Sequence, residues 1–424
     1  MYTAGRDVPP LLGEPRAGRS DAGRIRHGDF WYNLRSMKVC FETFGCRLSR
    51  AEALEQEAEF AARGWERTEG HADADLIVVR GCSVTQRAQR DCERLVEHIR
   101  RKYPMKRLVV TGCLPQKTKD FVLKARGASA APAIPMRTSR AYLKVQDGCS
   151  GKCTFCIVPK FRGQPASTPF SEVLEKARRF VDAGYSELVV TGCNLSLYDS
   201  DGKRLPELAA ALADVAPRVR LGSVEPSDAA REILDVMAER ANVCRFLHVP
   251  VQSGSSRILS AMGRPYSARD IDEFVHFARE KVPGIALGCD LMTGFPGEGD
   301  IDFLATKGLL SRAKFERVHV FPFSERPGTP AAAMPGAVPD EIRRARAREL
   351  ASQADRIRSA AAREFVGKTV EFVVEDEKTC SGWTSEYFWC SCPHSHAPRR
   401  SLAKAKIRTS EGHALSGEIE RHGG

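Results

Sequence analysis

Three cysteines in the stretch KVQDGCSGKCTFC have a spacing that suits an iron–sulfur cluster. Cys149, Cys153 and Cys156 follow the pattern C-x3-C-x2-C, with the aromatic Phe155 directly before the last of them. A 4Fe–4S cluster normally takes four thiolates, so three thiolates leave one iron open to bind a substrate. A zinc site and unliganded thiols are the alternatives, but zinc usually takes four ligands, often from two C-x2-C pairs. We therefore expect Cys149, Cys153 and Cys156 to hold a 4Fe–4S cluster.

Three further cysteines each end a predicted strand and follow a glycine. Cys46, Cys82 and Cys113 close the stretches ETFGC, VVRGC and VVTGC. Parallel strands bring their carboxyl ends to one edge of the sheet, where ligands bind, and glycine lets the backbone turn tightly and approach a ligand. One cysteine at a strand end would need no function, because buried cysteines are common. Three in the same register predict a second cluster site.

The elements that must position the second set lie in residues 37–130. Short apolar strands are predicted at 38–43, 75–80 and 107–111, and amphipathic helices at 48–62, 84–103 and 114–126. Alternating strands and helices are typical of a parallel sheet covered by helices. The looser stretch 128–140 is interpreted as a linker.

The same alternation resumes from residue 141 to about residue 322. Strands are predicted at 142–145, 188–191, 219–222, 245–250, 286–292 and 317–321, with helices between them, for example at 171–183, 228–240 and 269–281. Six such units indicate a full or partial α/β barrel, with a doubly wound sheet as the alternative. The Cys149 loop follows the first strand, and so lies at the carboxyl-terminal mouth, where α/β barrels keep their active sites. Residues 340–364 form a long, very basic helix.

The two ends of the chain lack the strand–helix alternation of the middle. Beyond residue 365 short β-type pieces such as KTVEFVVE predict a small all-β part, and no element boundary can be assigned after residue 380. Residues 1–36 are rich in Arg, Gly and Pro and lack the apolar region of a secretory signal. We expect either that residues 1–36 are a disordered tail or that they are a non-native extension and Met37 is the natural start.

Composition narrows the class of protein. Fourteen cysteines without an export signal favour metal binding or catalysis over disulfides. The net charge of +11, from 65 Lys and Arg against 54 Asp and Glu, favours a polyanionic partner such as nucleic acid. No run of about 18 apolar residues is present, so no membrane span is predicted.

Several long motifs, in order, resemble one family, the radical S-adenosylmethionine methylthiotransferases. The pattern C-x3-C-x-aromatic-C after a strand resembles the signature of radical S-adenosylmethionine enzymes, and YLKVQDGCSGKCTFCIVPKFRG resembles the start of the family's radical domain. FETFGCRLSRAEA, VVRGCSVTQRAQRD and VVTGCLPQ resemble its amino-terminal domain. HVPVQSGSSRILSAMGRPY, DLMTGFPGE and HVFPFSERPGTPAA resemble its later motifs. FVGKTVEFVVE followed by GWTSEYFWC resembles the start of its TRAM module, a small RNA-binding β-barrel.

This resemblance, which runs from residue 37 to about 390, implies a three-part architecture. It comprises an amino-terminal methylthiotransferase domain over 37–130, a radical S-adenosylmethionine domain over 138–364 built as a partial (β/α)6 barrel, and a TRAM-like β-barrel over 365–424. The TRAM pattern is lost after about residue 390, so we expect a degenerate end and a weaker grip on RNA. The span from Cys113 to Cys149 is shorter than is usual in the family, so we expect the last strand and helix of the first domain to be missing and that domain to be less stable.

The resemblance also implies the cofactors, two 4Fe–4S clusters and S-adenosylmethionine. The cluster on Cys149, Cys153 and Cys156 generates a 5′-deoxyadenosyl radical, which removes the unactivated hydrogen from carbon 2 of an adenine. The cluster on Cys46, Cys82 and Cys113 carries the sulfur; one S-adenosylmethionine methylates that sulfur and a second supplies the radical. The cofactors do the hard chemistry, and the protein supplies placement and a dry site.

Residues near strand ends are candidate contacts for the cofactor, although each can instead be a loop or cap residue. Thr191 and Gly192 are placed for the methionine amino group, and Ser223 and Glu225 for its carboxylate or the ribose. The full set of candidates is Phe155, Thr191, Gly192, Ser223, Glu225, Gln252 and Ser253. The GFPGE turn at 294–298 shapes the adenine pocket or merely joins a strand to a helix.

Arg162, beside the cluster loop, contacts the substrate or lies on the surface. His248 and His319 are expected to be satisfied barrel residues. No ligand role is expected for the remaining cysteines, which are Cys40, Cys92, Cys193, Cys244 and Cys289, nor for Cys380, Cys390 and Cys392 with His394 and His396.

Within the family, the motifs FETFGC and VQDGC most resemble those of the branch that acts on tRNA N6-threonylcarbamoyladenosine next to the anticodon. The isopentenyladenosine branch, a branch that modifies a ribosomal-protein aspartate, and a degenerate relative without turnover are the alternatives; the charge and the TRAM-like end favour RNA over protein. The implied partners are tRNA, an external electron donor of the flavodoxin or ferredoxin type and a sulfur donor. We expect a cytoplasmic monomer without membrane contact.

Overall fold

The computed structural model describes residues 37–82, 84, 86–114 and 138–420. The expected extension 1–36, nearly all of the expected helix 114–126 and the first part of the expected linker lie outside these residues. The amino-terminal, central and carboxyl-terminal parts described below belong to one compact unit that begins at Met37.

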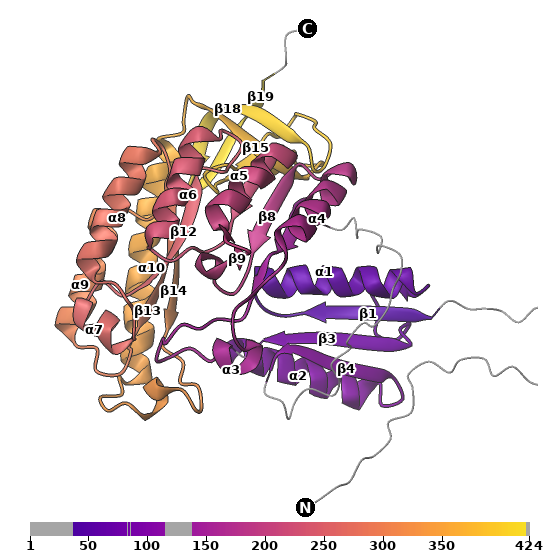
Figure 1. Cartoon of the computed structure of the whole chain (residues 1–424), viewed down its shortest axis with the longest axis horizontal. Coiled ribbons are helices and arrows are strands. Elements are labelled where there is room, and N and C mark those ends of the chain that lie inside the picture. The colour runs from indigo at the N-terminus through magenta and orange to yellow at the C-terminus, as the bar shows by residue number, and fades with distance from the viewer. Residues whose placement is uncertain (1–36, 83, 85, 115–137, 421–424) are drawn as a thin grey trace, which may run out of the picture. The chain divides into compact units, whose positions relative to one another are not determined.

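The amino-terminal part is a parallel sheet with the strand order β2-β1-β3-β4. Strand β3 (Leu76–Cys82) is buried along its whole length, which explains its nearly continuous apolar sequence. Helices α1 (Arg47–Ala62) and α2 (Gln86–Lys102) cover opposite faces of the sheet (Figure 1). The remaining strands are β1 (Lys38–Thr43), β2 (Glu66–Arg67) and β4 (Arg107–Cys113). The predicted strands and the first two predicted helices of this part are confirmed.

The central part is a partial barrel of parallel strands. Two sheets, β5-β8-β11 and β12-β13-β14, are joined by isolated bridges from Val219 to Val243 and from Ser223 to His248. The strands therefore follow one another in chain order, whereas a doubly wound sheet reverses its order at a switch point. The strands are β5 (Ala141–Lys144), β8 (Glu187–Thr191), β11 (Arg218–Leu221), β12 (Phe246–Gln252), β13 (Ala286–Thr293) and β14 (Arg317–Pro322).

Helices pack outside this partial barrel (Figure 1). They are α4 (Phe170–Asp182), α5 (Leu205–Val215), α6 (Asp228–Glu239), α7 (Ser256–Ala261), α8 (Ala268–Lys281), α9 (Asp300–Ala313) and α10 (Asp340–Arg363). Helix α10 follows Pro339 and has Asp340 and Glu341 in its first turn, where negative charge favours a helix start. None of the described helices is both long and apolar enough to cross a membrane.

Short elements shape the mouth of the partial barrel. They are β6 (Gln146–Asp147), α3 (Val158–Arg162), β7 (Ala166–Ser167), η2 (Leu195–Leu197), β9 (Asp199–Ser200), β10 (Lys203–Arg204) and η3 (Pro330–Ala333). The GFPGE turn joins β13 to α9, and the Glu298 carboxylate accepts hydrogen bonds from the Gly294 amide at 3.0 Å and from Arg346 of α10 at 2.7 Å. These contacts fix the turn against the long helix.

The carboxyl-terminal part is a closed β-barrel with the order β15-β16-β17-β19-β18. Its strands are β15 (Thr369–Asp376), β16 (Ser381–Thr384), β17 (Trp389–Ser391), β18 (Leu402–Glu411) and β19 (Ala414–Ile419). The expected loss of the pattern after residue 390 is therefore wrong for the fold, because β18 and β19 complete the barrel. Cys380, Cys390 and Cys392 are fully buried in its apolar core, so packing in that core accounts for these three cysteines.

Candidate active site

The fold brings together the three cysteines that follow glycines. Cys82 is the last residue of β3, Cys113 is the last residue of β4, and the two are direct partners in the parallel ladder. Cys46 stands after β1, the other neighbour of β3, at the start of α1. The three thiols therefore share one edge of the sheet, as the strand-end argument predicts.

Close packing around these thiols depends on glycine. A Cβ added at Gly45, whose φ is +118°, would lie 3.1 Å from the Cys82 Cβ. One added at Gly112, whose φ is +105°, would lie 2.3 Å from the Gly81 carbonyl oxygen. Both positions combine a left-handed backbone with no room for a side chain. The glycines let the three strand ends approach one another closely enough for their thiols to share a ligand.

The electrostatics of this site are those of clustered thiols. Burial raises the pKa of the Cys82 thiol, and the neighbouring Cys113 and Cys46 thiols raise it further. Burial also raises the pKa of Cys113, although Arg162 opposes that change. Cys46 is exposed, which leaves the site open on one side. Three convergent sulfur donors of this kind fit an iron–sulfur cluster.

The second set of thiols lies on the loop between β6 and α3. Gly151 donates its amide to the Cys149 sulfur at 3.3 Å, and a Cβ added there would lie 3.2 Å from that sulfur. Burial raises the pKa of the Cys156 thiol to about 11, and Cys153 and Cys149 add to the increase. A tight loop with three half-buried thiols suits a cluster with one open iron. Phe155 packs against an apolar group formed by Ile258, Met262, Met292, Phe295, Phe323 and Ala331.

Arg162 joins the helix that follows the loop cysteines to one of the strand-end cysteines. It ends α3, shortly after the Cys149–Cys156 loop, and its Nε donates to the Cys113 sulfur at 2.8 Å. Its guanidinium also binds both oxygens of Glu52 on α1, at 2.8 and 3.0 Å, and Asp147 on β6 at 2.9 Å. The side chain is only 9% exposed. The alternative of a surface arginine is therefore wrong.

A network of opposite charges holds Arg162 in place. Lys144 donates to Glu52 at 2.8 Å and to Asp147 at 2.7 Å, and Arg80 donates to Glu52 at 2.8 Å. Burial raises the pKa of Glu52, but the three cations outweigh it and hold the pKa of that carboxyl below its usual value. The network therefore stays charged and joins the amino-terminal sheet to the mouth of the barrel.

Arg264, which sequence reasoning missed, plays the corresponding part beside the loop cysteines. Its guanidinium donates to the Cys153 sulfur at 3.1 Å and to the Pro250 carbonyl at 3.0 Å, and it pairs with the Glu225 carboxylate. Burial lowers the pKa of Arg264, but Glu225 and Tyr266 outweigh it and keep the side chain charged. The one signal in the sequence was its position in the motif GRPY.

The candidate cofactor residues lie at strand ends around the mouth. Thr191, at the end of β8, is buried, and a Cβ added at Gly192 would lie 3.0 Å from the Gln146 side chain. Ser223 is exposed and forms a bridge to His248 of β12. Glu225 pairs with Arg264, which in turn donates to the loop cysteine Cys153, so Glu225 is linked to that cysteine through Arg264. These placements agree with a site at the mouth but assign no role to any one of them.

Gln252 stands out among these candidates. It ends β12 with φ at +70°, a backbone conformation that is uncommon for residues other than glycine. The residue is 7% exposed, and its Oε1 has no hydrogen-bond partner within the described part of the chain. Buried polar atoms are nearly always paired, and strained residues cluster at ligand sites. This unpaired acceptor fits a site for a ligand that donates a hydrogen bond.

The histidines of the partial barrel are satisfied, as expected. The Asp290 carboxylate lies 3.1 Å from His248 Nε2 and 3.2 Å from His319 Nδ1. Burial raises the pKa of Asp290, but the two imidazoles outweigh it and hold the pKa below its usual range. Among the cysteines without an expected role, Cys193 donates to Asp147 at 3.3 Å, so it lies beside the Arg162 network.

Two family models match the chain in agreement with this division. The radical SAM superfamily matches residues 143–310, and the family described as uncharacterized protein family UPF0004 matches residues 38–131. Together they cover the two parts that carry the two sets of cysteines.

Curated relatives with both kinds of tRNA substrate in their names are similar to the chain. The tRNA-2-methylthio-N(6)-dimethylallyladenosine synthase of Aquifex aeolicus is 30% identical and covers 91% of this chain and 99% of its own length. The threonylcarbamoyladenosine tRNA methylthiotransferase of Thermotoga maritima is 32% identical over 80% of this chain and 86% of its own length. That of Bacillus subtilis is 29% identical over 82% and 89%.

The solved structures support the fold. A radical S-adenosylmethionine methyltransferase from Kitasatospora setae, with cobalamin and a 4Fe–4S cluster bound, superposes with a TM-score of 0.51 at 14% identity, covering 70% of this chain and 77% of that one. At that identity the likeness concerns the fold alone. With the relatives above, the chain belongs to the radical S-adenosylmethionine tRNA methylthiotransferase family, whose cofactors are 4Fe–4S clusters and S-adenosylmethionine.

Proposed function

We propose that the protein transfers a methylthio group to carbon 2 of N6-threonylcarbamoyladenosine next to the anticodon of tRNA. The observation that supports the sulfur-insertion chemistry is the Arg162 contact with Cys113, because Arg162 ends the short helix that follows the loop cysteines and its Nε lies 2.8 Å from a strand-end sulfur. A radical made beside one set can then act on a substrate that also reaches sulfur held by the other set.

The two sets have different roles in this proposal. Cys149, Cys153 and Cys156 hold the cluster that binds S-adenosylmethionine, and Cys46, Cys82 and Cys113 hold the cluster that carries sulfur. When bound, these cofactors supply two things: a carbon radical, which removes the hydrogen from carbon 2 of the adenine, and the sulfur, which takes the place of that hydrogen.

The chain's own residues hold and orient the cofactors. The Gln252 Oε1 is placed to accept a hydrogen bond from the S-adenosylmethionine ammonium or ribose, because it lacks a partner in the described residues. Arg264 keeps positive charge beside Cys153 and positions Glu225. Phe155 and its apolar neighbours exclude water from one side of the loop cysteines. The other strand-end candidates, Thr191, Gly192 and Ser223, line the same mouth.

The choice between the two modified adenosines rests on short sequence motifs. FETFGC and VQDGC favour the threonylcarbamoyladenosine branch, and two similar relatives carry that substrate in their names. The isopentenyladenosine branch is the second candidate, because a relative named for the dimethylallyl form matches over nearly the whole chain. The net charge of +11 and the closed terminal barrel support tRNA as the partner.

The remaining assignments are proposals of the same kind. A flavodoxin- or ferredoxin-type protein supplies electrons, a separate donor replenishes sulfur, and the protein acts as a cytoplasmic monomer. Residues 37–130 form the domain that binds sulfur, residues 138–364 form the radical domain, and the barrel from 365 onward binds RNA.

Mass spectrometry of tRNA nucleosides from a deletion strain tests the substrate. Loss of the methylthio form of threonylcarbamoyladenosine supports the proposal, and loss of the methylthio isopentenyl form instead assigns the other branch. Anaerobic reconstitution tests the chemistry: the wild type should hold about eight irons per chain, and Cys82→Ala about four. Cys82→Ala should still cleave S-adenosylmethionine without forming product, while Cys92→Ala, a buried cysteine outside both sets, should behave as wild type. About four irons in the wild type would contradict the two-cluster assignment and favour a degenerate relative.

A further inference from the structure

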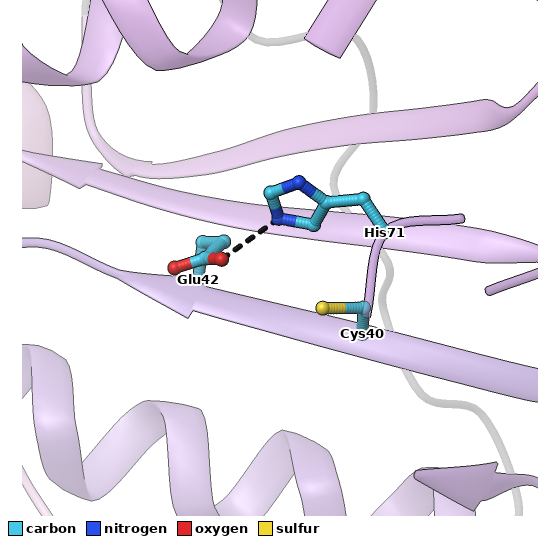
Figure 2. A group of neighbouring side chains, drawn as sticks. All are labelled: Cys40, Glu42 and His71. Carbon is cyan, nitrogen blue, oxygen red and sulfur yellow. Dashed lines mark hydrogen bonds and ion pairs between the residues drawn. The ribbon is translucent and has the colours of Figure 1, made fainter. Parts of the chain in front are cut away.

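A third group of possible metal ligands lies on the amino-terminal sheet, apart from the six cysteines discussed above. Among the described residues, the ligand atoms of Cys40, Glu42 and His71 all lie within 4.8 Å of one another. Cys40 and Glu42 are two residues apart on β1, so their side chains project from the same face of the sheet. Figure 2 shows both side chains beside the imidazole of His71, whose Nε2 lies 2.8 Å from the Glu42 Oε1.

The backbone already holds these three side chains together. His71 lies in the segment after β2, and the Thr68 amide at its start donates to the Val39 carbonyl of β1 at 2.9 Å. The Asp73 amide donates to the Gly70 carbonyl at 3.2 Å, which closes the turn that carries His71. The imidazole packs edge to face against Tyr103, with the ring centroids 6.0 Å apart. No strand has to move for the three ligand atoms to meet.

The three donors have the chemistry of a zinc site. Zinc binds thiolate at about 2.3 Å, imidazole at about 2.0–2.1 Å and carboxylate at about 2.0–2.2 Å, in tetrahedral geometry. Those bond lengths place neighbouring ligand atoms roughly 3–4 Å apart, within the observed limit. Three protein ligands leave a fourth position for water, and zinc or a similar first-row cation is favoured by mixed sulfur and nitrogen donors.

The surroundings also suit a cation. Cys40 is buried among apolar residues of β3 and α2, whereas the side chains of Glu42 and His71 are 36% and 17% exposed. One side of the group is therefore dry and the other is open to an entering ion. Cys40 lies within its strand, whereas Cys82 and Cys113 lie at strand ends, so the group is separate from the proposed sulfur-carrying cluster.

We propose that Cys40, Glu42 and His71 form a binding site for a zinc-class divalent cation that fastens the turn after β2 to β1. In the metal-free form, the Cys40 thiol contacts the Glu69 carbonyl at 3.7 Å and His71 pairs with Glu42. The cation replaces both contacts, and binding releases the thiol proton. In this proposal the cation ties the turn to β1, keeps its fourth position open to water, and takes no part in the reaction at the barrel mouth.

The test uses the full chain with its iron–sulfur clusters reconstituted, because empty cluster cysteines would themselves bind zinc. After equilibration with zinc and removal of excess metal, iron and zinc are counted by mass spectrometry, and zinc neighbours are identified by X-ray absorption at the zinc edge. We expect about one zinc per chain, with one sulfur neighbour at about 2.3 Å and nitrogen or oxygen at the other positions.

Variants at the two partly exposed ligands make the outcome decisive. His71→Ala and Glu42→Gln should each weaken zinc binding without changing the iron content, and His71→Ala, which removes a direct ligand, should cost more than the roughly 10–100-fold lost with an outer-shell partner. Cys92→Ala, which alters another buried cysteine in the same apolar group, should keep the zinc. Zinc should also raise the melting temperature of the wild type but not that of His71→Ala. The proposal fails if the reconstituted wild type holds no stoichiometric zinc, if the zinc has three or four sulfur neighbours, or if His71→Ala retains it.

Discussion

Replacing Arg162 with Gln tests whether this side chain tunes the proposed sulfur-carrying cluster. The change removes the donor to the Cys113 sulfur and the paired contacts with Glu52. Lys144 and Arg80 still neutralise Glu52, so the carboxylate is not left buried without a partner. We therefore expect the chain to fold, with a loss of about 2–3 kcal/mol in the free energy of unfolding, below the roughly 3–5 kcal/mol for stripping a buried pair.

The reduction potential of the proposed cluster should change as well. A unit charge at about 5 Å with an effective dielectric constant of about 20 contributes about 3 kcal/mol, and 1.4 kcal/mol corresponds to about 59 mV for one electron. Reduction adds negative charge, which a nearby guanidinium stabilises. Removing the guanidinium should therefore make the reduction potential of the proposed cluster more negative by about 60–140 mV.

The measurement is a redox titration followed by electron paramagnetic resonance. Cys149, Cys153 and Cys156 are replaced by Ala so that only the proposed strand-end cluster contributes. Arg162→Lys, which keeps the charge, should recover most of the potential. Lys160→Gln removes a charge from the same short helix without touching Cys113 and should leave the potential unchanged. Equal potentials in wild type and Arg162→Gln, or the same shift in Lys160→Gln, would refute the reasoning.

Three further changes probe buried polar side chains. Glu187 is fully buried, and although burial raises its pKa, three surrounding arginines outweigh that effect and lower the pKa to about 2. In a urea titration, Glu187→Gln should lower the free energy of unfolding by about 3–5 kcal/mol. Glu232→Gln, which alters an exposed ion pair, should lower it by less than about 1 kcal/mol. Because that folded pKa is depressed, the stabilisation is complete above pH 4.5 and is lost as the pH falls toward 2. Gln252→Gly relieves the positive φ, so it should retain or raise the melting temperature while S-adenosylmethionine cleavage falls; unchanged cleavage would remove Gln252 from the site. Burial raises the pKa of Tyr387, but Arg47, Arg140 and Arg220 outweigh it and lower the pKa to about 8, so ultraviolet titration should show one tyrosine ionising near pH 8 that is missing in Tyr387→Phe. The wild type should gain stability over that variant as the pH rises from about 8 to 10, by about 2.7 kcal/mol at most.

The parts of the site predictable from sequence are those fixed by local pattern. Alternating apolar strands and amphipathic helices imply a parallel sheet, and a parallel sheet places the ends of neighbouring strands together. The pairing of Cys82 with Cys113 follows from that rule alone. The glycine before each of them provides a second local signal, because neither position has room for a side chain: a Cβ at Gly81 would lie 2.5 Å from the Cys92 sulfur, and one at Gly112 would lie 2.3 Å from the Gly81 carbonyl oxygen.

What sequence reasoning missed depends on contacts between distant residues or on weak apolar signals. Arg162 and Glu52 are 110 positions apart, and no local pattern indicates that their side chains meet. Strand β18 was missed for another reason. Its buried face is built from Ala403, Ala405 and Ile407, and alanine is too small to distinguish a buried strand face from a polar loop.

The two sets of cysteines are built on one principle, although different elements supply them. Each set has an arginine that donates to one of its sulfurs, Arg162 to Cys113 and Arg264 to Cys153. A carboxylate on another element holds each guanidinium, so the donor is fixed before any cofactor arrives. An iron–sulfur cluster ligated by thiolates carries excess negative charge, and donors to its sulfurs stabilise the reduced state. Arginine suits this task because it stays charged when buried and offers several donors in a fixed plane. The carboxylates that hold it also balance its charge, which explains how so many ions can lie together at the mouth of the barrel.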